Sequence, residues 1–411
     1  MNILMMSEAY PPTIDGVSLH VQSLSKQLSE RGHRVSVCTI RQRGSLSYEE
    51  EDNIKIHRLK GIFQRIPGLY QDRAEKGHPP VRDWLISREL SRLLSREKPD
   101  IIHAHGWILY SVLPLISKNK IPLVYTLHDY RLICPKMIPV KQNGICSETL
   151  TRDCIFCLRP VCGLLRAIPA YVSLKRNINA LQSVSKFIAL NHQIEEDHIK
   201  NLKIDSGKVK IIPNFCDVAA DYTKIKNEEL PDEFIMFAGK LAPQKGVDVL
   251  IEAYRRLNTD IKLLIFGKET PGYNYQSTGN ISIIKNASHN NVINAMARCK
   301  FVVVPSTCYD TFPTVALETM SQKKAVIASN IEGLKSIVVD GVTGILVSPN
   351  NPIELSDAVL YLMKKPEIAL RMGERGYSVY LKNFTPDVVI KKIIQLYEST
   401  ISSQPRKLSK S

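Results

Sequence analysis

Two carboxylates in the stretch CYDTFPTVALE, residues 308–318, raise the question of what chemistry this chain performs. Asp310 and Glu318 are separated by seven residues and follow the apolar run KFVVVPS, which is typical of a buried strand. If a helix begins near Pro313, its unpaired amides can receive a phosphate, and the two acids can address the two ends of one ligand. A nucleotide-sugar fits this pattern, with hydroxyls at both ends and a diphosphate between them. A solvated helix edge is the alternative that spacing alone leaves open.

Two lysines supply the opposite charge in a second loop. Lys240 and Lys245, in GKLAPQKG, lie five positions apart in a glycine-bounded loop that follows the apolar run FIMFA. Two cations placed in this way could straddle a diphosphate and neutralise its charge. A solvated basic turn is the alternative.

The first half of the chain offers a glycine and three histidines. Gly16 lies after the first apolar run and begins a helical pattern, where a glycine lets an anion approach the free amides. His128 ends the apolar stretch IPLVYTL beside Asp129, a position that suits hydrogen bonding to a polar ligand. For His103 and His105, in IIHAHG, we expect a structural role in the core.

The elements that must position these residues alternate between strand and helix in both halves. NILMMS, a helical pattern and RVSVCTI form one βαβ unit, and the alternation restarts at FIMFAG after the acid-rich connection YTKIKNEELPDE. Near-continuous apolar strands indicate parallel sheets covered on both faces, so the fold class is α/β with two doubly wound domains facing a cleft. We predict domains at 1–212 and 213–385, a helix at 386–402 that can cross back to the first domain, and a disordered tail at 403–411.

The charge of the chain points to polyanionic neighbours. The formal net charge is +15, which suits nucleotide phosphates, acidic lipid or nucleic acid. Residues 55–98 hold eleven Lys and Arg against five Asp and Glu, and they include a basic amphipathic helix with Trp84. Its apolar stripe is expected either to face its own domain or to touch an anionic membrane surface. No leader and no long apolar run are evident, so we expect a cytoplasmic protein, peripheral on the inner membrane face.

Four of the nine cysteines are closely spaced. Cys146, Cys154, Cys157 and Cys162 have seven, two and four residues between them, and such a set could close a tetrahedral zinc site. Only the C-x-x-C spacing is typical of zinc, so free thiols remain an alternative. Disulfides are the least expected outcome in a reducing compartment.

Seven stretches, taken in order along almost the whole chain, resemble the retaining glycosyltransferases of family 4, whose fold is GT-B, with two Rossmann-like domains. These stretches are PPTIDGVSLHVQSLSKQLSERGHRVSV, DIIHAHGW, YTLHDYRLICP, VKIIPNFCD, FAGKLAPQKGVDVLIEAY, VPSTCYDTFPTVALETM and IEGLKSIVVDGVTGILVSP.

The resemblance assigns roles to the residues singled out above. It implies that Asp310 contacts the transferred sugar, Glu318 binds ribose, and His128 lies near the reacting carbon. The remaining residues that it places at the donor are Gly16, Lys240, Lys245, Thr314 and Val315.

Three positions depart from the family pattern. Asp15 stands where many members have a glycine, and Lys240 replaces the commoner Arg. Asp310 is one methylene shorter than the usual Glu, so donor choice is expected to be decided there.

The function that the resemblance implies is retaining transfer of a hexose, such as mannose or glucose. The donor would be a UDP- or GDP-linked sugar and the acceptor a glycolipid or polysaccharide, with no metal or other cofactor required. A GT-B sugar-nucleotide epimerase is the first alternative. A basic nucleic-acid-binding protein is the second, but the chain has no RRM, KH or zinc-finger signature, so we expect no nucleic-acid partner.

Overall fold

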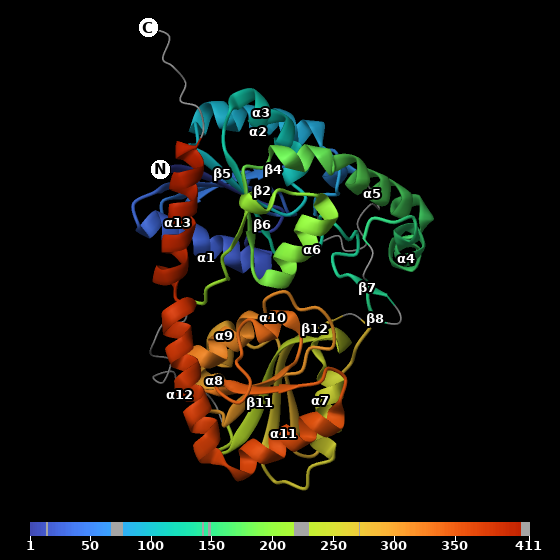
Figure 1. Cartoon of the computed structure of the whole chain (residues 1–411), viewed down its shortest axis with the longest axis vertical. Coiled ribbons are helices and arrows are strands. Elements are labelled where there is room, and N and C mark those ends of the chain that lie inside the picture. Colours follow the sequence, from blue (N-terminus) through green and yellow to red (C-terminus); the bar gives the residue numbers. More distant parts are fainter. Residues whose placement is uncertain are drawn as a thin grey trace. The chain divides into compact units, whose positions relative to one another are not determined.

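The computed structural model describes residues 1–13, 15–66, 77–141, 144–146, 149–217, 230–270 and 272–403. It divides into two compact units (Figure 1). Unit 1 comprises Met1–Ile212 together with Ile390–Ser411, and unit 2 comprises Pro213–Val389. Most of the acid-rich connection, at 222–233, and most of the predicted tail, at 403–411, lie outside the described residues.

Unit 1 is built on one large sheet with the strand order β10-β9-β6-β5-β1-β2-β4-β3. All neighbours pair in parallel except β3 and β4, which are antiparallel. The strands are β1 (Asn2–Ser7), β2 (Arg34–Ile40), β3 (Tyr48–Glu51), β4 (Ile54–Leu59), β5 (Ile101–His105), β6 (Leu123–Leu127), β9 (Lys186–Ala189) and β10 (Val209–Ile211). A separate two-stranded ribbon is formed by β7 (Val140–Lys141) and β8 (Gly144–Ile145).

Helices of unit 1 that form where the apolar periodicity predicts them are α1 (Gly16–Glu30), α2 (Trp84–Glu97), α3 (Leu109–Asn119) and α6 (His192–Leu202). The sequence did not predict α4 (Asp153–Cys162) or α5 (Leu164–Asn177). The last helix of the chain, α13 (Pro386–Ser402), belongs to unit 1 from Ile390 onward and buries Tyr397 completely. The terminal segment of the sequence therefore completes the unit with which the sequence begins.

The basic amphipathic helix of the sequence is α2. Asp83 caps it, because its side chain accepts hydrogen bonds from the amides of Leu85 and Ile86. Leu90, Leu93 and Leu94 are buried, which turns the apolar stripe toward unit 1 itself. Trp84 stays 58% exposed, and residues 67–76 of the basic stretch lie outside the described part of the chain.

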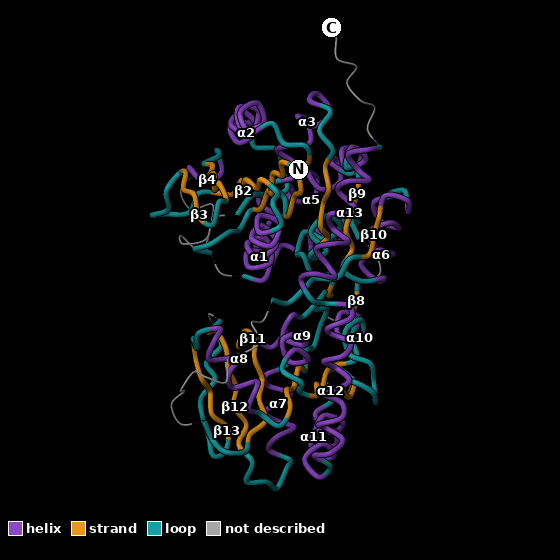
Figure 2. Tube along the Cα trace, turned by 90° about the vertical axis from the view of Figure 1, so that its left-hand side faces the viewer, coloured by secondary structure: helices purple, strands orange, loops and turns teal. Residues whose placement is uncertain are grey.

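Unit 2 has one fully parallel sheet with the order β13-β12-β11-β14-β15-β16. Figure 2 shows its strands running side by side between helices. The strands are β11 (Phe234–Leu241), β12 (Lys262–Glu269), β13 (Ile281–Lys285), β14 (Phe301–Val304), β15 (Ala325–Ser329) and β16 (Gly344–Val347). The helices are α7 (Val247–Arg255), α8 (His289–Arg298), α9 (Thr314–Ser321), α10 (Glu332–Lys335), α11 (Pro352–Lys364) and α12 (Pro366–Asn383).

Each sheet reverses its strand order at one point. In unit 1 the chain runs from β1 outward to β2 and then returns to place β5 on the other side of β1. In unit 2 it runs from β11 to β12 and β13 and then places β14 on the other side of β11. Connections diverge at such a switch point and leave a crevice outside the carboxyl ends of the strands, where ligands of open α/β sheets bind.

Gly246, which precedes α7, is a position where the backbone requires glycine. Its φ is +74°, and a Cβ added there would overlap the carbonyl oxygen of Pro305, just after β14. Gly341 has a similar φ of +69°, but a Cβ there would meet nothing within 4 Å. An alanine at Gly341 would thus meet only the cost of a left-handed backbone, whereas an alanine at Gly246 would meet that cost and a steric clash as well.

We predict that Gly246→Ala destabilises the protein much more than Gly341→Ala. The left-handed conformation alone costs an alanine about 1–2 kcal/mol, and only Gly246→Ala adds a collision with main-chain atoms. Urea unfolding of both variants beside the wild type measures the difference. Equal losses of unfolding free energy would contradict the steric role of Gly246.

Candidate functional site

The carboxyl ends of β11 and β14 bring together two of the residues singled out in unit 2. Lys245 lies in the short 3-10 turn Pro243–Lys245 after β11, and Asp310 lies in the loop after β14. The Nζ of Lys245 forms an ion pair with Oδ2 of Asp310. Ser306 donates a hydrogen bond to the same oxygen, at 3.2 Å. We call Lys245, Ser306, Asp310 and Glu318 the lysine–carboxylate site.

The ion pair is accessible to solvent on one side. The side chain of Lys245 is 34% exposed and that of Asp310 is 18% exposed. In such a setting the pair itself adds little to stability, so its partners can be exchanged at small cost. An incoming anion can therefore take Lys245 from Asp310.

The two loops that carry the pair are fixed to each other by backbone contacts. The amide of Thr307 donates to the carbonyl of Gln244 at 3.0 Å, and its hydroxyl donates to the carbonyl of Pro243 at 3.0 Å. On the other side, Gly333 approaches so closely that a Cβ there would overlap the carbonyl oxygen of Asp310. Sequence reasoning singled out neither Ser306 nor Gly333, although the latter lies in the family-like stretch IEGLKSIVVDG.

Glu318 lies within α9, which begins at Thr314 as the sequence predicted. No side chain caps the first turn of α9, so the amides there, including those of Thr314 and Val315, remain suited to an anion. Glu318 is half-buried, and burial raises the pKa of its carboxyl, while nearby His289 lowers it. Lys240 is exposed and forms part of β11 instead of following it, so Lys245 alone of the two lysines pairs with Asp310.

In unit 1, Gly16 is the first residue of α1, and Asp15 caps that helix. The side chain of Asp15 accepts a hydrogen bond from the amide of Ser18 at 2.7 Å. This residue is the departure from the family's glycine noted above. The carboxylate of Asp15 already accepts a hydrogen bond from an amide of the first turn of α1. Its negative charge therefore opposes the binding of another anion at the start of this helix.

His128 belongs to a cluster of four histidines at the carboxyl ends of β5 and β6. Its Nε2 lies 2.8 Å from Nδ1 of His105, and its ring lies 5.0 Å from that of His20, one turn after Gly16. The ring centroid of His103 lies 4.3 Å from that of His105, with the two rings tilted by 39°. We call His20, His103, His105 and His128 the histidine cluster.

The histidine cluster is anchored by the last helix. Nδ1 of His103 lies 2.6 Å from the hydroxyl of Tyr397, and Nε2 lies 2.7 Å from Oγ1 of Thr126. Both ring nitrogens of His103 are thus satisfied inside the core, which is the structural role expected for it.

All four histidines are neutral near pH 7. Burial lowers the pKa of His20 to about 4 and, with His20 nearby, that of His103 to about 3. Burial and the neighbouring rings hold the pKa of His105 and of His128 well below the usual range. His128 can therefore act on a ligand as a neutral hydrogen-bonding group and not as a cation.

A part-buried charge network beside the cluster was missed by sequence reasoning. Glu8, directly after β1, accepts hydrogen bonds from the backbone amide of Trp107 and from Nη1 of Arg131, the latter at 3.0 Å. Arg131 also pairs with Asp129 at 2.7 Å. Gly106 has a φ of +84° and leaves room for Glu8, because a Cβ there would overlap the carboxylate. The available signal was an acid placed immediately after the first buried strand, at the switch point of unit 1.

Comparisons with known proteins identify the family and the fold. The sequence model for Glycosyltransferase Family 4 matches residues 14–220, and that for Glycosyl transferases group 1 matches residues 220–379. The chain belongs to glycosyltransferase family 4. It is a transferase enzyme, and the nucleic-acid-binding alternative finds no support in these matches.

Similar proteins match over nearly the full length of the chain. An uncharacterized glycosyltransferase of Methanocaldococcus jannaschii is 28% identical over 97% of this chain and 98% of that protein. The structure of sucrose-phosphate synthase from Thermosynechococcus elongatus has a TM-score of 0.73 at 18% identity, covering 98% of this chain and 100% of that one. That of Anabaena HepE in complex with UDP and glucose has a TM-score of 0.69 at 16% identity, covering 97% and 100%. The fold is GT-B, as the resemblance implied. Among the described residues, no helix combines the length and apolar character needed to span a membrane.

We predict that acid destabilises unit 1 through its histidines. Each buried histidine has a folded-state pKa below its unfolded value near 6.5, so the unfolded state binds more protons as the pH falls. The free energy of unfolding therefore has its full value above about pH 6.5 and falls toward pH 4. The loss is up to about 1.4 kcal/mol per pH unit for each histidine. Urea unfolding at pH 7.5, 6 and 5 measures the slope.

Two variants make this prediction specific. His20→Gln removes one of the contributing histidines and should flatten the slope by about 1.4 kcal/mol per pH unit. His192→Gln, at an 81% exposed side chain, is the matched control and should leave it unchanged. A slope that is the same in all three proteins would refute the assignment.

Proposed function

We propose that this protein transfers a hexose, such as mannose or glucose, from a nucleotide-diphosphate sugar to a glycolipid or polysaccharide acceptor with retention of configuration. The observation that carries the proposal is the ion pair of Lys245 and Asp310 beside the uncapped start of α9, at the switch point of unit 2. Cation, carboxylate and helix amides occur there together, as a charged donor with a hydroxyl-bearing sugar requires.

Donor binding would exchange the partners of the ion pair. Lys245 would leave Asp310 for the diphosphate, assisted by Lys240 and by the amides of Thr314 and Val315. Asp310, still held by Ser306, could then accept hydrogen bonds from the hydroxyls of the transferred sugar. Because Asp310 stays ionised while the diphosphate adds negative charge, Lys245 needs the help of Lys240 and of the helix amides to offset that charge.

At the nucleotide end, Glu318 would bind the ribose hydroxyls. A carboxylate accepts hydrogen bonds at both oxygens only when ionised, and burial has raised the pKa of Glu318. We therefore propose that, as the pH falls, donor affinity is lost at a higher pH than it would be if Glu318 had the pKa of an ordinary glutamate.

The chemical step would proceed on one face of the sugar. The bond from the anomeric carbon to the diphosphate oxygen breaks, the bond to the acceptor oxygen forms, and the acceptor proton passes to the departing diphosphate. The transition state resembles an oxocarbenium ion, whose leaving group Lys245 and the helix amides stabilise. Neutral His128 would serve as a hydrogen-bonding group for a sugar, and no protein nucleophile is assigned.

The nucleotide of the donor is proposed from the family and not from the site alone. Anabaena HepE was solved in complex with UDP and glucose, and the catalytic domain of starch synthase IV from Arabidopsis thaliana was solved bound to ADP and acarbose. UDP-, GDP- and ADP-sugars are therefore the first donors to screen, and Asp310→Glu is the variant in which we expect the order of preference among transferred sugars to change.

We predict that donor transfer depends on the lysine–carboxylate site. Lys245→Ala should lower kcat/KM by about 10²–10³-fold, because one cation leaves the developing diphosphate charge. Glu318→Gln should raise the donor Kd by about tenfold or more, as loss of a charge-assisted hydrogen bond does. Transfer to a saccharide acceptor and calorimetric donor binding measure the two effects.

The control is Lys262→Ala, an exposed lysine at the amino end of β12, which should leave both quantities unchanged. Wild-type transfer by Lys245→Ala and Glu318→Gln would overturn the site. Consumption of donor without an acceptor-linked product would instead favour the epimerase alternative.

We also propose that the acceptor is lipid-linked and that the enzyme meets it at an anionic membrane surface. The support is an exposed apolar patch on α4 and α5, which pack against each other (Figure 1). The patch is more extensive than the single exposed Trp84 of α2. Its side chains are Phe156, Val161, Leu164, Leu165 and Ile168, and we call it the α4–α5 surface.

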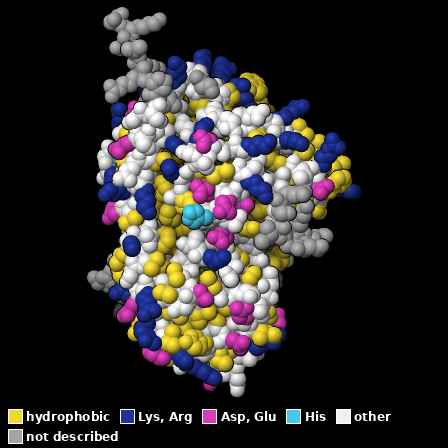
Figure 3. Space-filling view, viewed as in Figure 1, with side chains coloured by type: hydrophobic (Ala, Val, Ile, Leu, Met, Phe, Trp, Pro, Cys, Tyr) yellow, Lys and Arg dark blue, Asp and Glu magenta, His cyan; other side chains and the backbone are white. Residues whose placement is uncertain are grey.

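Basic residues surround the α4–α5 surface. Residues 151–177 contain five Lys and Arg but only one acid, Asp153. In Figure 3 hydrophobic and basic side chains lie next to each other over these helices. Apolar insertion and attraction to acidic headgroups reinforce each other in such an arrangement.

We predict that the protein cosediments with vesicles containing anionic phospholipid, less so at high salt. Leu165→Asp, at a 92% exposed position, should reduce binding at least tenfold, because a charge replaces an inserted apolar group. Leu370→Asp, at a 61% exposed position in unit 2, is the control and should bind normally. If Trp84→Ala and not Leu165→Asp reduces binding, the contact lies on the 55–98 region instead; if the wild type does not bind at all, the proposal fails.

A further inference from the structure

Four cysteines of unit 1 line one pocket together with Pro135, Lys136 and Pro139. They are Cys134, Cys146, Cys154 and Cys157, and we call this place the four-thiol pocket. These four cysteines differ from the four closely spaced cysteines of the sequence, because the pocket contains Cys134 and not Cys162. The thiol of Cys162 is directed instead to the backbone carbonyls of Leu158 and Gly163.

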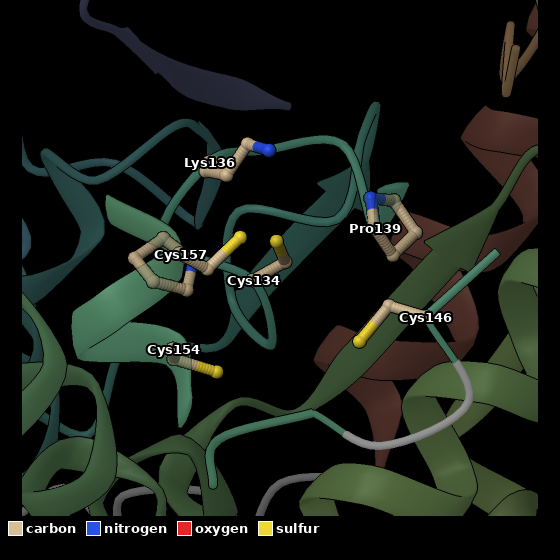
Figure 4. A pocket seen from close by; sticks show the side chains of 7 residues that line it. Cys134, Lys136, Pro139, Cys146, Cys154 and Cys157 are labelled. Atoms are coloured by element: carbon tan, nitrogen blue, oxygen red, sulfur yellow. The ribbon is translucent and has the colours of Figure 1, made fainter. Parts of the chain in front are cut away.

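Figure 4 shows the four sulfur atoms directed into the space between three backbone segments. Four thiols gathered in one pocket form a set of soft ligands that suits a thiophilic cation.

Each ligand comes from an element with a defined geometry. Cys134 opens a tight turn in which the amide of Met137 donates to its carbonyl at 2.8 Å. Cys146 ends the β7–β8 ribbon, where its amide donates to the carbonyl of Pro139 at 2.8 Å. Cys154 and Cys157 lie in the first two turns of α4, three positions apart and therefore on one face of the helix.

We propose that Cys134, Cys146, Cys154 and Cys157 bind one zinc ion as four thiolates. A turn, a short ribbon and a helix start that each contribute cysteines suit the tetrahedral geometry of zinc, and the Cys154-x-x-Cys157 spacing is the usual one. The positive end of the α4 dipole lies on the ligand side and favours the net negative tetrathiolate.

Binding requires a contraction of the pocket. As they stand, no three metal-ligating side chains of the described residues are close enough to hold an ion. The four sulfurs would have to move inward to about 2.3 Å from the metal. The turn, the ribbon and α4 are separate segments, so they can approach one another without any change in the large sheet.

The role of this zinc is structural. Four protein ligands leave no open coordination position for substrate or water, which distinguishes such a site from a catalytic one. The ion would fix the start of α4 and hence the α4–α5 surface. The inference is independent of the proposed sugar transfer, since it concerns metal content and local order.

The test is the metal content of the full-length protein, produced in zinc-supplemented medium and purified without chelator or a metal affinity resin. About one zinc per chain is expected by mass spectrometry. Cys157→Ser should lower this to near zero, and Cys162→Ser, on the same helix but outside the pocket, should retain it. Exchange of the wild-type zinc for Co²⁺ should give the intense visible absorption of tetrahedral cobalt thiolate, which keeps the test valid even if Cys157→Ser does not fold.

A second readout is local order. Removing the zinc with a chelator should speed tryptic cleavage after Arg152 at least tenfold in the wild type and in Cys162→Ser alike. A zinc content near zero with all nine cysteines titrating as free thiols would overturn the proposal, and so would a disulfide among the four or iron in place of zinc. Equal zinc content in Cys157→Ser and wild type would exclude the four-thiol pocket as its location.

Discussion

A strand buried on both faces can hold a polar side chain inside only if that side chain finds a partner, as His103 does in β5, and this constraint organises both units. Most of the remaining polar residues of the two sites lie at or just beyond the carboxyl ends of mainly apolar strands, which are β1, β5 and β6 in unit 1 and β11 and β14 in unit 2. Because neighbouring strands run parallel, those residues meet at one edge of each sheet. A site built in this way is positioned by the most rigid part of the molecule.

The two units use that edge differently. After β1 and β6, Glu8 and Arg131 form a part-buried ion pair beside four neutral histidines. Glu8 also accepts a hydrogen bond from the amide of Trp107, and Arg131 also pairs with Asp129, so several bonds hold this network in a fixed shape. The pair of Lys245 and Asp310 in unit 2 is partly exposed and held by one further hydroxyl, so it can exchange partners. Unit 1 is thus built for rigidity and unit 2 for a change of ionic partner.

The alternation of strands and helices around the two large sheets could be predicted from the sequence, because apolar periodicity determines it, whereas the β7–β8 ribbon, α4 and α5 could not. The start of α9 and the position of Asp310 before it were also predictable. The partners of these residues were not, since Ser306 and Gly333 carry no signal of their own. Likewise, the spacing of cysteines favoured Cys162, whereas the fold brings the distant Cys134 to the pocket through a turn that no local pattern marks. The sequence placed Lys240 in a loop after the strand. In the structure β11 continues through Lys240 because it pairs there with β12, and local sequence does not show such a pairing.

The contact between Tyr397 and His103 spans 294 positions of the chain. During synthesis the large sheet of unit 1 leaves the ribosome first, but the hydroxyl that satisfies its central histidine is made almost last. Unit 2 is continuous in sequence and can fold in full while unit 1 still lacks a helix. Unit 1 therefore begins to fold before unit 2 but is completed after it. A chain truncated before α13 can have a fully folded unit 2, but the core of its unit 1 stays incomplete.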